Sequence, residues 1–339
     1  MKKVLIGMSG GIDSSVGAIL LKNEGYEVIG ATMVLFDSNN QNVEDAKKVC
    51  EALNIEHHTI ELKKEFKEKV IDNFINSYLN GATPNPCIEC NRFFKFGYLY
   101  EKAKELGCNY IATGHYAKIK DGKLLKSDVI EKDQTYFLYK IKKEVLNHII
   151  FPLESFNNKD EIRQIASNYN LPVKNKKDSQ EICFITNNDY SSYLENNIDI
   201  LPPKGDFILK DGTIIGKHKG IMYYTIGQRK GLGISYSKPL YVIEINTKNN
   251  TITLGDESDL YNTGLIATNI NLLVDKIPDT IQAKVRYRSN CAPCSIELIN
   301  NNEFKLIFNE KQKSITKGQS VVLYDGDICI GGGIIKEVY

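Results

Sequence analysis

A pair of glycines near the N-terminus constrains the fold more than any other feature of the chain. Gly10 and Gly11 follow the apolar run at residues 4–6 and precede a helical pattern that places Val16 and Ile19 on one face. A strand that passes through a glycine turn into an amphipathic helix is typical of a βαβ unit. Paired glycines let the backbone turn tightly and direct N–H groups toward an anion, and the positive end of a helix strengthens that preference. The pattern therefore predicts an anion-binding loop on an α/β sheet.

Alternating strands and helices continue from this loop to about residue 200. Further strands are expected at residues 26–35, 56–62 and 110–113. Helices are expected at residues 43–53, on both sides of a proline-rich loop at 83–91, and at 135–147, 159–168 and 189–196. Strands that alternate with helices predict a parallel sheet covered on both faces.

The pattern changes at Leu201-Pro202-Pro203, beyond which helical periodicity largely stops. Two hairpins are expected at residues 207–215 and 240–254, around Asp-Gly and Asn-Asn turns. Short strands, typical of a small barrel, then recur at 281–287, 294–298, 304–308, 320–324 and 328–335. We therefore predict an α/β domain at 1–200, a small central, mostly-β domain at 201–263 and a C-terminal β-barrel at 264–339.

Composition narrows the class of protein. The 43 basic and 42 acidic residues cancel, so a nucleic-acid partner would need a local basic surface. No stretch approaches the roughly 18 apolar residues of a membrane span, and the first apolar run is too short for a signal peptide. Eight cysteines without a secretion signal favour thiol chemistry, metal binding or inert core positions over a disulfide framework. We expect a cytoplasmic protein with no membrane partner.

The glycine loop reads Ser9-Gly10-Gly11-Ile12-Asp13-Ser14-Ser15 and lacks the spacing of a P-loop or of a dinucleotide-binding fingerprint. It resembles the PP-loop of ATP pyrophosphatases, which have an adenine nucleotide α-hydrolase-like fold. The resemblance implies that the loop holds the β- and γ-phosphates of ATP as they leave as pyrophosphate, with Mg²⁺ taking part. Asp13 is expected either to help hold Mg²⁺ or the phosphates, or to cap the helix. Several classes of PP-loop enzyme share this loop, so the loop alone does not identify the substrate.

Two cysteines lie in the proline-rich loop, in the pattern Cys87-x-x-Cys90. A helix is expected to begin near Arg92, and a thiol at a helix start beside Arg92 and Lys95 should have a lowered pKa. The alternative is half of a zinc site, completed by Cys291-x-x-Cys294, although the two pairs fall in different predicted domains.

Two more residues allow two interpretations each. Cys183 lies in an apolar segment, where a free cysteine usually packs as a small buried residue of a strand. His115 ends a predicted strand at the carboxyl edge of the sheet, where ligands bind, although a histidine there is often simply exposed to solvent.

Arg286 and Arg288 alternate along a predicted strand with Lys284, and this strand face fits either RNA phosphates or solvent. Gly227 to Gly233 form a glycine-rich segment that is either a flap ordered by RNA or a plain loop.

Ordered segments along the whole chain carry a more specific resemblance. They read GMSGGIDSSV at 7–16, TPNPCIECNRFFKF at 83–96, ATGHYA at 112–117, KDQTYFLY at 132–139, KDSQEICFI at 177–185, TIGQRKGLGI at 225–234, KVRYR at 284–288 and GQSVVLYDGDICIGGGII at 318–335. With these segments the chain resembles the bacterial tRNA-specific 2-thiouridylases of the MnmA/TrmU type over essentially its whole length.

This resemblance implies an activity and its residues. The reaction would be ATP-dependent 2-thiolation of the wobble uridine, position 34, of tRNAs with Lys, Glu and Gln anticodons, with sulfur from a cysteine desulfurase or sulfur-relay protein. Cys90 would be the nucleophile and Cys183 the persulfide carrier, and the two would close a disulfide after transfer. ATP would be held by Gly7, Met8, Ser9, Gly10, Gly11, Ile12, Asp13, Ser14, Met33 and Gly114. The target base would meet Asn85, Pro86 and Cys87, and the tRNA would meet His115, Lys132, Asp133, Gln134, Arg286, Tyr287 and Gln319.

One position departs from the family pattern. Many members carry Asp where this chain has Cys87, and related tRNA thiolases with Cys-x-x-Cys and a third cysteine hold a 4Fe–4S cluster. Cys87, Cys90 and Cys183 are therefore candidate cluster ligands, as an alternative to the persulfide relay. The PP-loop alone also fits another tRNA-modifying or amide-forming ligase, or a non-catalytic RNA-binding protein that senses a nucleotide.

Overall fold

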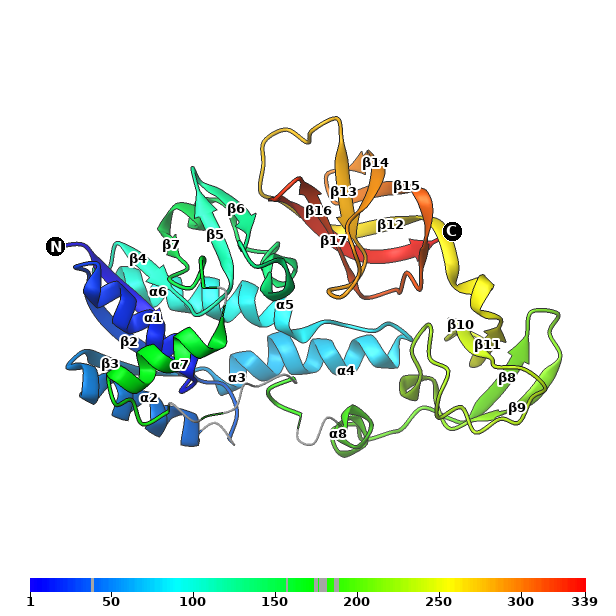
Figure 1. Cartoon of the computed structure of the whole chain (residues 1–339). Helices are drawn as coiled ribbons and strands as arrows, with labels where there is room; N and C mark the ends of the chain where they lie inside the picture. The colour runs from blue at the N-terminus through cyan, green and yellow to red at the C-terminus, as the bar shows by residue number, and fades with distance from the viewer. Residues whose placement is uncertain (38–39, 157, 174–175, 177–181, 186–188) are drawn as a thin grey trace.

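The computed structural model describes residues 1–37, 40–156, 158–173, 176, 182–185 and 189–339. Its first sheet has five parallel strands in the order β3-β2-β1-β4-β7 (Figure 1). The strands are β1 Lys3–Gly7, β2 Glu27–Val34, β3 Glu56–Glu61, β4 Tyr110–Ala112 and β7 Ile149–Ile150. The predicted α/β class with a parallel sheet is confirmed.

Side chains on opposite faces of this sheet enter two separate cores. Leu5 packs with Leu99 and Ala103 on one face, whereas Val4 and Ile6 enter the core on the other. Successive residues of a strand point to opposite faces, so a strand buried on both faces must be continuously apolar, as 4–6 are. The helices of the second core are α1 Ile12–Asn23, α2 Asn40–Leu53 and α7 Lys159–Asn168.

A broken helix runs from the sheet toward the central domain (Figure 1). It comprises α3 Lys63–Phe66, a π-helical turn at Lys67–Ile71 and α4 Asp72–Leu79. Phe74 and Tyr78 of α4 pack with Phe207 and Tyr223, so the core of the central domain includes a helix from the first domain. The chain returns through α5 Pro86–Cys90, a π-helical stretch Asn91–Tyr98 and α6 Leu99–Glu105.

The central domain is mostly β. It contains short 3₁₀ turns at Ile221–Tyr223 and Glu257–Leu260 and a sheet in the order β10-β11-β8-β9. Helix α8 Tyr190–Asn196, at the end of the predicted first domain, packs into the same core through Leu194. The strands of the sheet are β8 Gly205–Leu209, β9 Ile214–His218, β10 Tyr241–Asn246 and β11 Thr251–Gly255. Both predicted hairpins are confirmed, and β8 and β11 join them by parallel pairing.

The C-terminal barrel closes because β12 pairs with both β15 and β17. Its strands are β12 Tyr261–Leu272, β13 Ile281–Lys284, β14 Ala292–Asn300, β15 Glu303–Lys313, β16 Ser320–Asp325 and β17 Ile328–Val338. The prediction missed β12, which crosses the proposed boundary at 263/264. It was also wrong about 281–287, because β13 ends at Lys284 and the next residues form a turn closed by Arg286 and Ser289.

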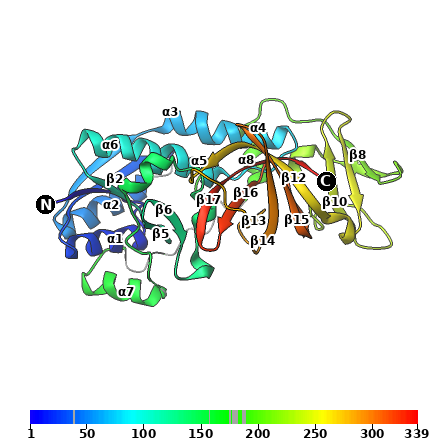
Figure 2. The same cartoon turned by 90° about the horizontal axis from the view of Figure 1, so that it is seen from above.

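A hairpin from the first domain extends the barrel sheet. β5 Ala117–Lys120 and β6 Lys123–Lys126 follow the first sheet, and β6 pairs with β17 through Leu124–Cys329 and Leu125–Ile328. Both views place this hairpin between the parallel sheet and the barrel (Figures 1 and 2). The two domains therefore share backbone hydrogen bonds.

The predicted helix at 135–147 is wrong. The chain forms 3₁₀ turns at Ile130–Lys132, Thr135–Phe137 and Lys143–His148. Tyr136 and Tyr139 are fully buried, and both hydroxyls reach Ser320 of the barrel. Contacts with the barrel on one side and the first domain on the other override the helical periodicity. Among the described helices, none has the length and apolar character needed to cross a membrane.

Candidate functional site

The glycine loop has the geometry that its sequence predicts. Gly10 has φ +67°, and a Cβ there would lie 2.4 Å from the backbone oxygen of Asn42. Gly11 is extended and precedes the first turn of α1, where Gly114 approaches so closely that a Cβ would lie 3.1 Å from the nitrogen of Ser14. The loop thus lies between α2 and the end of β4. This leaves no room for a side chain at Gly10 and little room at Gly114.

Serine side chains fix the path of this loop. Ser14 Oγ accepts a hydrogen bond from the Ser9 nitrogen at 3.2 Å and lies 3.1 Å from Ser9 Oγ. Ser15 Oγ donates to the carbonyl oxygen of Gly11 at 2.8 Å. Met8 and Ile12 are buried and anchor the two ends, and Gly7 ends β1. These contacts pre-form the backbone turn at the start of α1.

Asp13 faces two other side chains. Its carboxylate accepts a hydrogen bond from Tyr116 at 3.3 Å and forms an ion pair with Lys159 at 3.3 Å. It does not act as the helix cap, because Gly11 occupies that position and the cap has no side-chain hydrogen bond. Lys159 begins α7 and belongs to none of the motifs found in the sequence. Only the structure identifies it as a neighbour of Asp13. Met33 lies half-buried near the end of β2, against the cores of the sheet and of the broken helix.

The cysteine loop enters α5 with Asn85 at the position before the helix and Pro86 in its first turn. Glu89 of this short helix forms an ion pair with Lys140, whose side chain is 4% exposed, and lies 3.8 Å from Arg92. Burial lowers the pKa of Lys140, while Glu89 counteracts that shift. The helix is therefore held to the turn between the 3₁₀ segments Thr135–Phe137 and Lys143–His148 by a nearly buried pair of charges.

The expected lowering of the thiol pKa is wrong. Cys90 is 9% exposed, and burial raises its pKa to about 11, against the smaller opposing effect of Lys95. Cys87 is exposed, but desolvation by the chain around its sulfur still raises its pKa, and Lys95 again opposes the shift. Arg92 is engaged with Glu89 and the ring of Phe93 rather than with a thiol. Desolvation of the thiolate outweighs one nearby cation.

Cys183 meets these thiols from a distant part of the chain. It is exposed and lies in a turn closed by the Ile185 nitrogen and the Ile182 oxygen, so the buried-strand interpretation is wrong. Although Cys183 is exposed, desolvation by the chain around its sulfur raises its pKa to about 12; Cys90 and Cys87 raise it further, while Lys95 lowers it. All three sulfurs are thus within electrostatic reach of one another and of one lysine. Phe184 packs on Phe66 and Phe74 beside them. Residues 177–181 of the same motif lie outside the described residues.

His115 is buried at 8% exposure, which contradicts the solvent-exposed alternative. Its Nδ1 lies 2.8 Å from Thr113 Oγ1, and its Nε2 lies 3.4 Å from Lys95 Nζ. Burial, followed by the Lys95 charge, lowers its pKa well below the usual value, so the ring is neutral at pH 7. Because His115 directly follows Gly114, it connects the glycine loop to Lys95 and the thiols.

The segment Lys132-Asp133-Gln134 surrounds Tyr116. Lys132 Nζ lies over the Tyr116 ring and is buried without a hydrogen-bond partner among the described residues. Asp133 is buried and accepts hydrogen bonds from Ser127 and Thr135. Gln134 Oε1 accepts a hydrogen bond from the Tyr116 backbone N–H. A tRNA contact at these residues stays a prediction, and in this structure Asp133 and Gln134 shape the loop.

The predicted tRNA-contacting residues of the barrel turn toward the protein. Arg286 donates to the Ile226 carbonyl at 3.1 Å and to Thr316 Oγ1 at 2.5 Å, so it does not share an open strand face with Arg288. The Tyr287 ring packs on Phe137 with centroids 4.4 Å apart. Gln319 Nε2 donates to the carbonyl oxygen of Thr83 at 2.8 Å, at the base of the cysteine loop.

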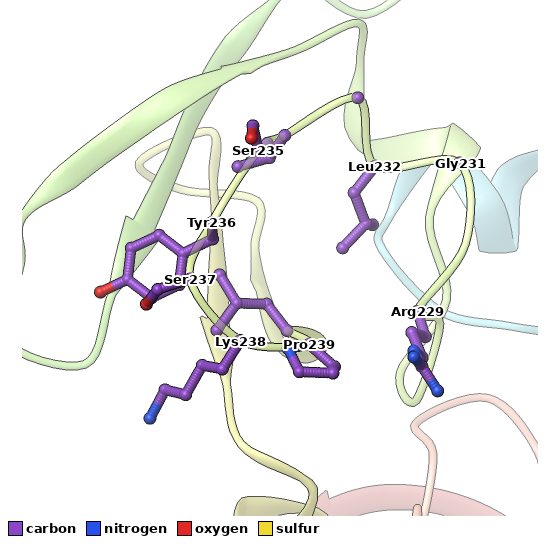
Figure 3. Close-up of a pocket in the computed structure, with 11 residues that line it drawn as sticks. Arg229, Gly231, Leu232, Ser235, Tyr236, Ser237, Lys238 and Pro239 are labelled. Carbon is purple, nitrogen blue, oxygen red and sulfur yellow. The ribbon is translucent and has the colours of Figure 1, made fainter.

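The glycine-rich segment of the central domain borders a pocket of about 700 Å³. Figure 3 shows Arg229 on one side of the pocket and Tyr236 and Lys238 on the other. Lys238 pairs with Asp256 at 2.7 Å. The described lining of this pocket has cationic side chains but no cysteine, which distinguishes it from the site around the thiols.

Among the residues that the structure describes, no group of three or more His, Cys, Asp or Glu side chains is arranged to hold a metal ion. Cys87, Cys90 and Cys183, as well as Cys291 and Cys294 of the barrel, are all described, and they form no such group in this structure. Neither the zinc alternative nor the 4Fe–4S alternative finds support in this arrangement. All of these cysteines are free thiols.

Known proteins match the chain over its whole length. Residues 2–187 match a family described as tRNA methyl transferase HUP domain, 191–256 its PRC-barrel domain, and 262–335 an aminomethyltransferase beta-barrel domain. A tRNA-specific 2-thiouridylase MnmA of Clostridioides difficile is 49% identical, covering 99% of this chain and 98% of the relative. One from Clostridium beijerinckii is 47% identical, covering 99% of both.

Solved structures resemble part of the fold. A 4-thiouridine synthetase–RNA complex with bound ATP is 19% identical, with a TM-score of 0.40, covering 58% of this chain and 50% of that chain. An NMN synthetase from Francisella tularensis is 21% identical, with a TM-score of 0.34, covering 52% and 66%. Membership of a family follows from the full-length sequence relatives. The chain belongs to the tRNA-specific 2-thiouridylase family.

Proposed function

We propose that the chain is a tRNA-uridine 2-sulfurtransferase that thiolates the wobble uridine at the expense of ATP. One observation carries this proposal: Gly114 packs on the glycine loop while the adjacent His115 contacts Lys95, the lysine shared by Cys87, Cys90 and Cys183. An anion-binding turn and a set of thiols thus meet at the carboxyl edge of one parallel sheet, where α/β proteins bind their ligands. The family membership supports the same reaction.

The first step activates the base. The uridine leaves the anticodon stack so that its C2 oxygen can attack the α-phosphorus of ATP. Pyrophosphate departs into the loop formed by Ser9, Gly10 and Gly11, where the backbone and the start of α1 favour an anion. Mg²⁺ would neutralise phosphate charge, and Asp13 is the loop carboxylate that is placed to help. Its ion pair with Lys159 would then have to rearrange.

The second step delivers sulfur. A donor of the cysteine desulfurase or sulfur-relay class leaves a persulfide on Cys183, which is exposed and therefore accessible. The Cys90 thiolate attacks the inner sulfur, a Cys90–Cys183 disulfide forms, and hydrosulfide leaves. Hydrosulfide adds to C2 and AMP departs with the former C2 oxygen. An external thiol reductant then supplies two electrons to restore both thiols.

The partners follow from this chemistry. The tRNA would be one with a Lys, Glu or Gln anticodon, bound along the surface that includes Arg229 and Lys238. A cytoplasmic location suits both tRNA and a thiol-dependent cycle.

Nucleoside analysis tests the proposal. Purified protein is incubated with ATP, unmodified tRNA and a persulfide donor, and the digested tRNA is examined for 2-thiouridine by mass spectrometry. Cys90→Ser and Cys183→Ser should each abolish 2-thiouridine while tRNA binding persists. Cys329→Ser, a barrel cysteine with no place in the scheme, is the matched control and should retain activity. Product formation by both site variants would refute the relay.

A rival PP-loop ligase or a non-catalytic RNA-binding protein predicts different outcomes. A ligase would release pyrophosphate with tRNA but would tolerate loss of Cys90 and Cys183. A binding protein would release no pyrophosphate at all. Measuring pyrophosphate and 2-thiouridine in the same reaction therefore separates the three activities.

A further inference from the structure

Two hydrogen-bonded side chains on neighbouring strands of the parallel sheet reach the start of the glycine loop. Thr32 of β2 is 3% exposed, and its Oγ1 donates to the carbonyl oxygen of Met8 at 2.9 Å. His57 of β3 is half-buried, and its Nε2 lies 2.9 Å from the same Oγ1. Because β1 ends at Gly7, Met8 is the residue at which the chain leaves the sheet for the loop. The two side chains therefore act where the loop begins.

The direction of these hydrogen bonds follows from the groups involved. A carbonyl oxygen only accepts, so the single hydroxyl proton of Thr32 is used by Met8. His57 Nε2 must therefore donate to Thr32 Oγ1. The neutral imidazole can do so with its proton on Nε2, and the charged ring can do so as well. The hydrogen-bond chain from His57 through Thr32 to Met8 is consequently independent of the protonation state of the ring.

One rigid peptide unit carries this contact into the loop. The Met8–Ser9 peptide is trans, so the Ser9 N–H points away from the Met8 carbonyl oxygen in the same plane. The Ser9 N–H donates to Ser14 Oγ at 3.2 Å, and Ser14 Oγ donates to the Gly11 carbonyl oxygen at 3.2 Å. Thr32 thus holds one end of the peptide, and the first turn of α1 holds the other. Rotation of the peptide would break both contacts.

Gly30 of β2 leaves room for this arrangement. A Cβ at Gly30 would lie 2.7 Å from Cys50 Sγ of α2 and 3.2 Å from Met8 Cγ. It would also lie 3.5 Å from Cδ2 of His57. The imidazole and the Met8 side chain therefore pack against bare backbone. The Met8 nitrogen also donates to the Ala31 oxygen at 2.7 Å, so Met8 is held by its side chain, its N–H and its carbonyl before the loop begins.

We propose that Thr32, oriented by His57, is a positioning residue for ATP, which fixes the Met8–Ser9 peptide and thereby the direction in which the loop N–H groups face the phosphates. This inference rests on the ATP step of the proposed function. A site made of backbone N–H groups stabilises an anion without reorganisation when its peptide planes are already oriented. Loss of the Thr32 hydroxyl would leave the buried Met8 carbonyl without this donor and release one end of the peptide.

The test measures ATP binding by the full chain without tRNA or a sulfur donor. Thr32→Val keeps the side-chain shape but removes the hydroxyl, and should weaken binding of ATP with Mg²⁺, and of pyrophosphate, roughly fivefold, the equivalent of a typical hydrogen bond. Thr32→Ser keeps the hydroxyl and should stay within about twofold of the parent. His57→Leu leaves the Thr32 hydroxyl in place and should weaken binding by less than Thr32→Val does. Isothermal titration calorimetry gives each dissociation constant.

A matched variant separates positioning from a loss of stability. Thr253→Val removes another buried threonine hydroxyl, in β11 of the central domain, which donates to Glu244 at 3.5 Å. It should leave ATP binding unchanged. Hydrogen exchange in the absence of nucleotide gives a second readout, because the Ser9 amide should exchange faster in Thr32→Val than in the parent or in Thr253→Val. Affinity for tRNA should be the same in all of these variants.

Either a parental dissociation constant for ATP or parental exchange at Ser9 in Thr32→Val would overturn the inference, as would equal weakening of ATP binding in Thr253→Val. If Thr32→Val does not fold, His57→Leu decides, since parental exchange at Ser9 in that variant would contradict the hydrogen-bond chain. A parent chain that binds no ATP would instead refute the ATP step of the proposed function, and exchange at Ser9 would still test Thr32. Thiolation by the parent stands whatever the Thr32 variants show.

Discussion

Gln319 Nε2 donates a hydrogen bond to the carbonyl oxygen of Thr83 at 2.8 Å, across 236 residues of sequence. The Thr83 nitrogen donates in turn to the Lys317 oxygen at 2.9 Å. Thr83 Oγ1 also meets Thr225 Oγ1 of the central domain at 3.3 Å. The segment that leads into the cysteine helix α5 is thus held by the barrel and the central domain together.

Removal of this hydrogen bond should loosen the cysteine loop. We expect Gln319→Leu to reduce the thiolation rate while ATP binding is unchanged, because the Thr83 carbonyl loses its donor and the glycine loop is untouched. The stability cost should be about 1 kcal/mol. Faster hydrogen exchange in residues 82–90 checks the cause. Gln312→Leu, at a glutamine whose Nε2 donates to the backbone oxygen of the nearby Glu310, is the control. Equal exchange in the two variants would contradict the role of Gln319.

The glycine loop should not tolerate a side chain at Gly10. Its φ of +67° and the 2.4 Å approach of the Asn42 oxygen both exclude a Cβ. Gly10→Ala should therefore destabilise the protein by about 1–3 kcal/mol or more and abolish ATP binding. Gly107→Ala is the matched control, because Gly107 has the same φ of +67° with nothing near its Cβ. Thermal unfolding and ATP titration measure both effects. Equal losses in the two variants would show that strain alone, without the Asn42 contact, explains the result.

Loss of one partner of the Glu89–Lys140 ion pair should destabilise the fold more than loss of both partners. Lys140→Met leaves Glu89, whose side chain is 12% exposed, without its main partner and should cost about 3–5 kcal/mol. The double variant Glu89→Leu/Lys140→Met should recover part of that loss. The exposed pair Glu303–Lys336 is the control, and Lys336→Met should cost at most about 1 kcal/mol. Chemical denaturation measures these variants together with the single variant Glu89→Leu, and a double-variant loss equal to the sum of the two single losses would contradict coupling.

Acid should destabilise the protein partly through His115. Its pKa is lowered by burial and then by Lys95, so the folded state stays deprotonated at a pH where the unfolded chain binds a proton. Stability is therefore lost as pH falls below the unfolded value of about 6.5, by at most about 1.4 kcal/mol for each pH unit. His57 and His218, whose pKa values are also lowered, contribute in the same direction.

Replacement of this histidine isolates its share. His115→Gln should flatten the decline in unfolding free energy between about pH 6.5 and pH 5. Urea denaturation at several pH values gives the comparison. An identical pH slope in the parent and His115→Gln would contradict a neutral buried imidazole.

Local patterns predicted much of the first half of the fold, because its central strands β1 and β2 are buried on both faces and its helices are amphipathic. The start of α1 was predicted from Gly10 and Gly11, and α7 was predicted from its periodicity. The hairpin β5–β6 was not predictable, because its partner β17 lies about 200 residues later in the sequence. Pairing across that separation has no local signature.

The same limit applies to the site. Motifs identified Cys90, Cys183 and Gly10, but not the sign of the thiol pKa shifts, since burial is a tertiary property. They also could not show that Arg286 and Gln319 bind protein carbonyls, or that Lys159 reaches Asp13 across 146 residues. Such contacts depend on three domains meeting, and no residue type encodes them.

The most direct test of the account is the redox state of two thiols after one turnover. The protein is loaded with one persulfide, given ATP and tRNA without reductant, quenched with an alkylating agent and mapped by mass spectrometry. A Cys90–Cys183 disulfide should form in step with 2-thiouridine. Formation of 2-thiouridine with both thiols still reduced and alkylated would contradict the mechanism.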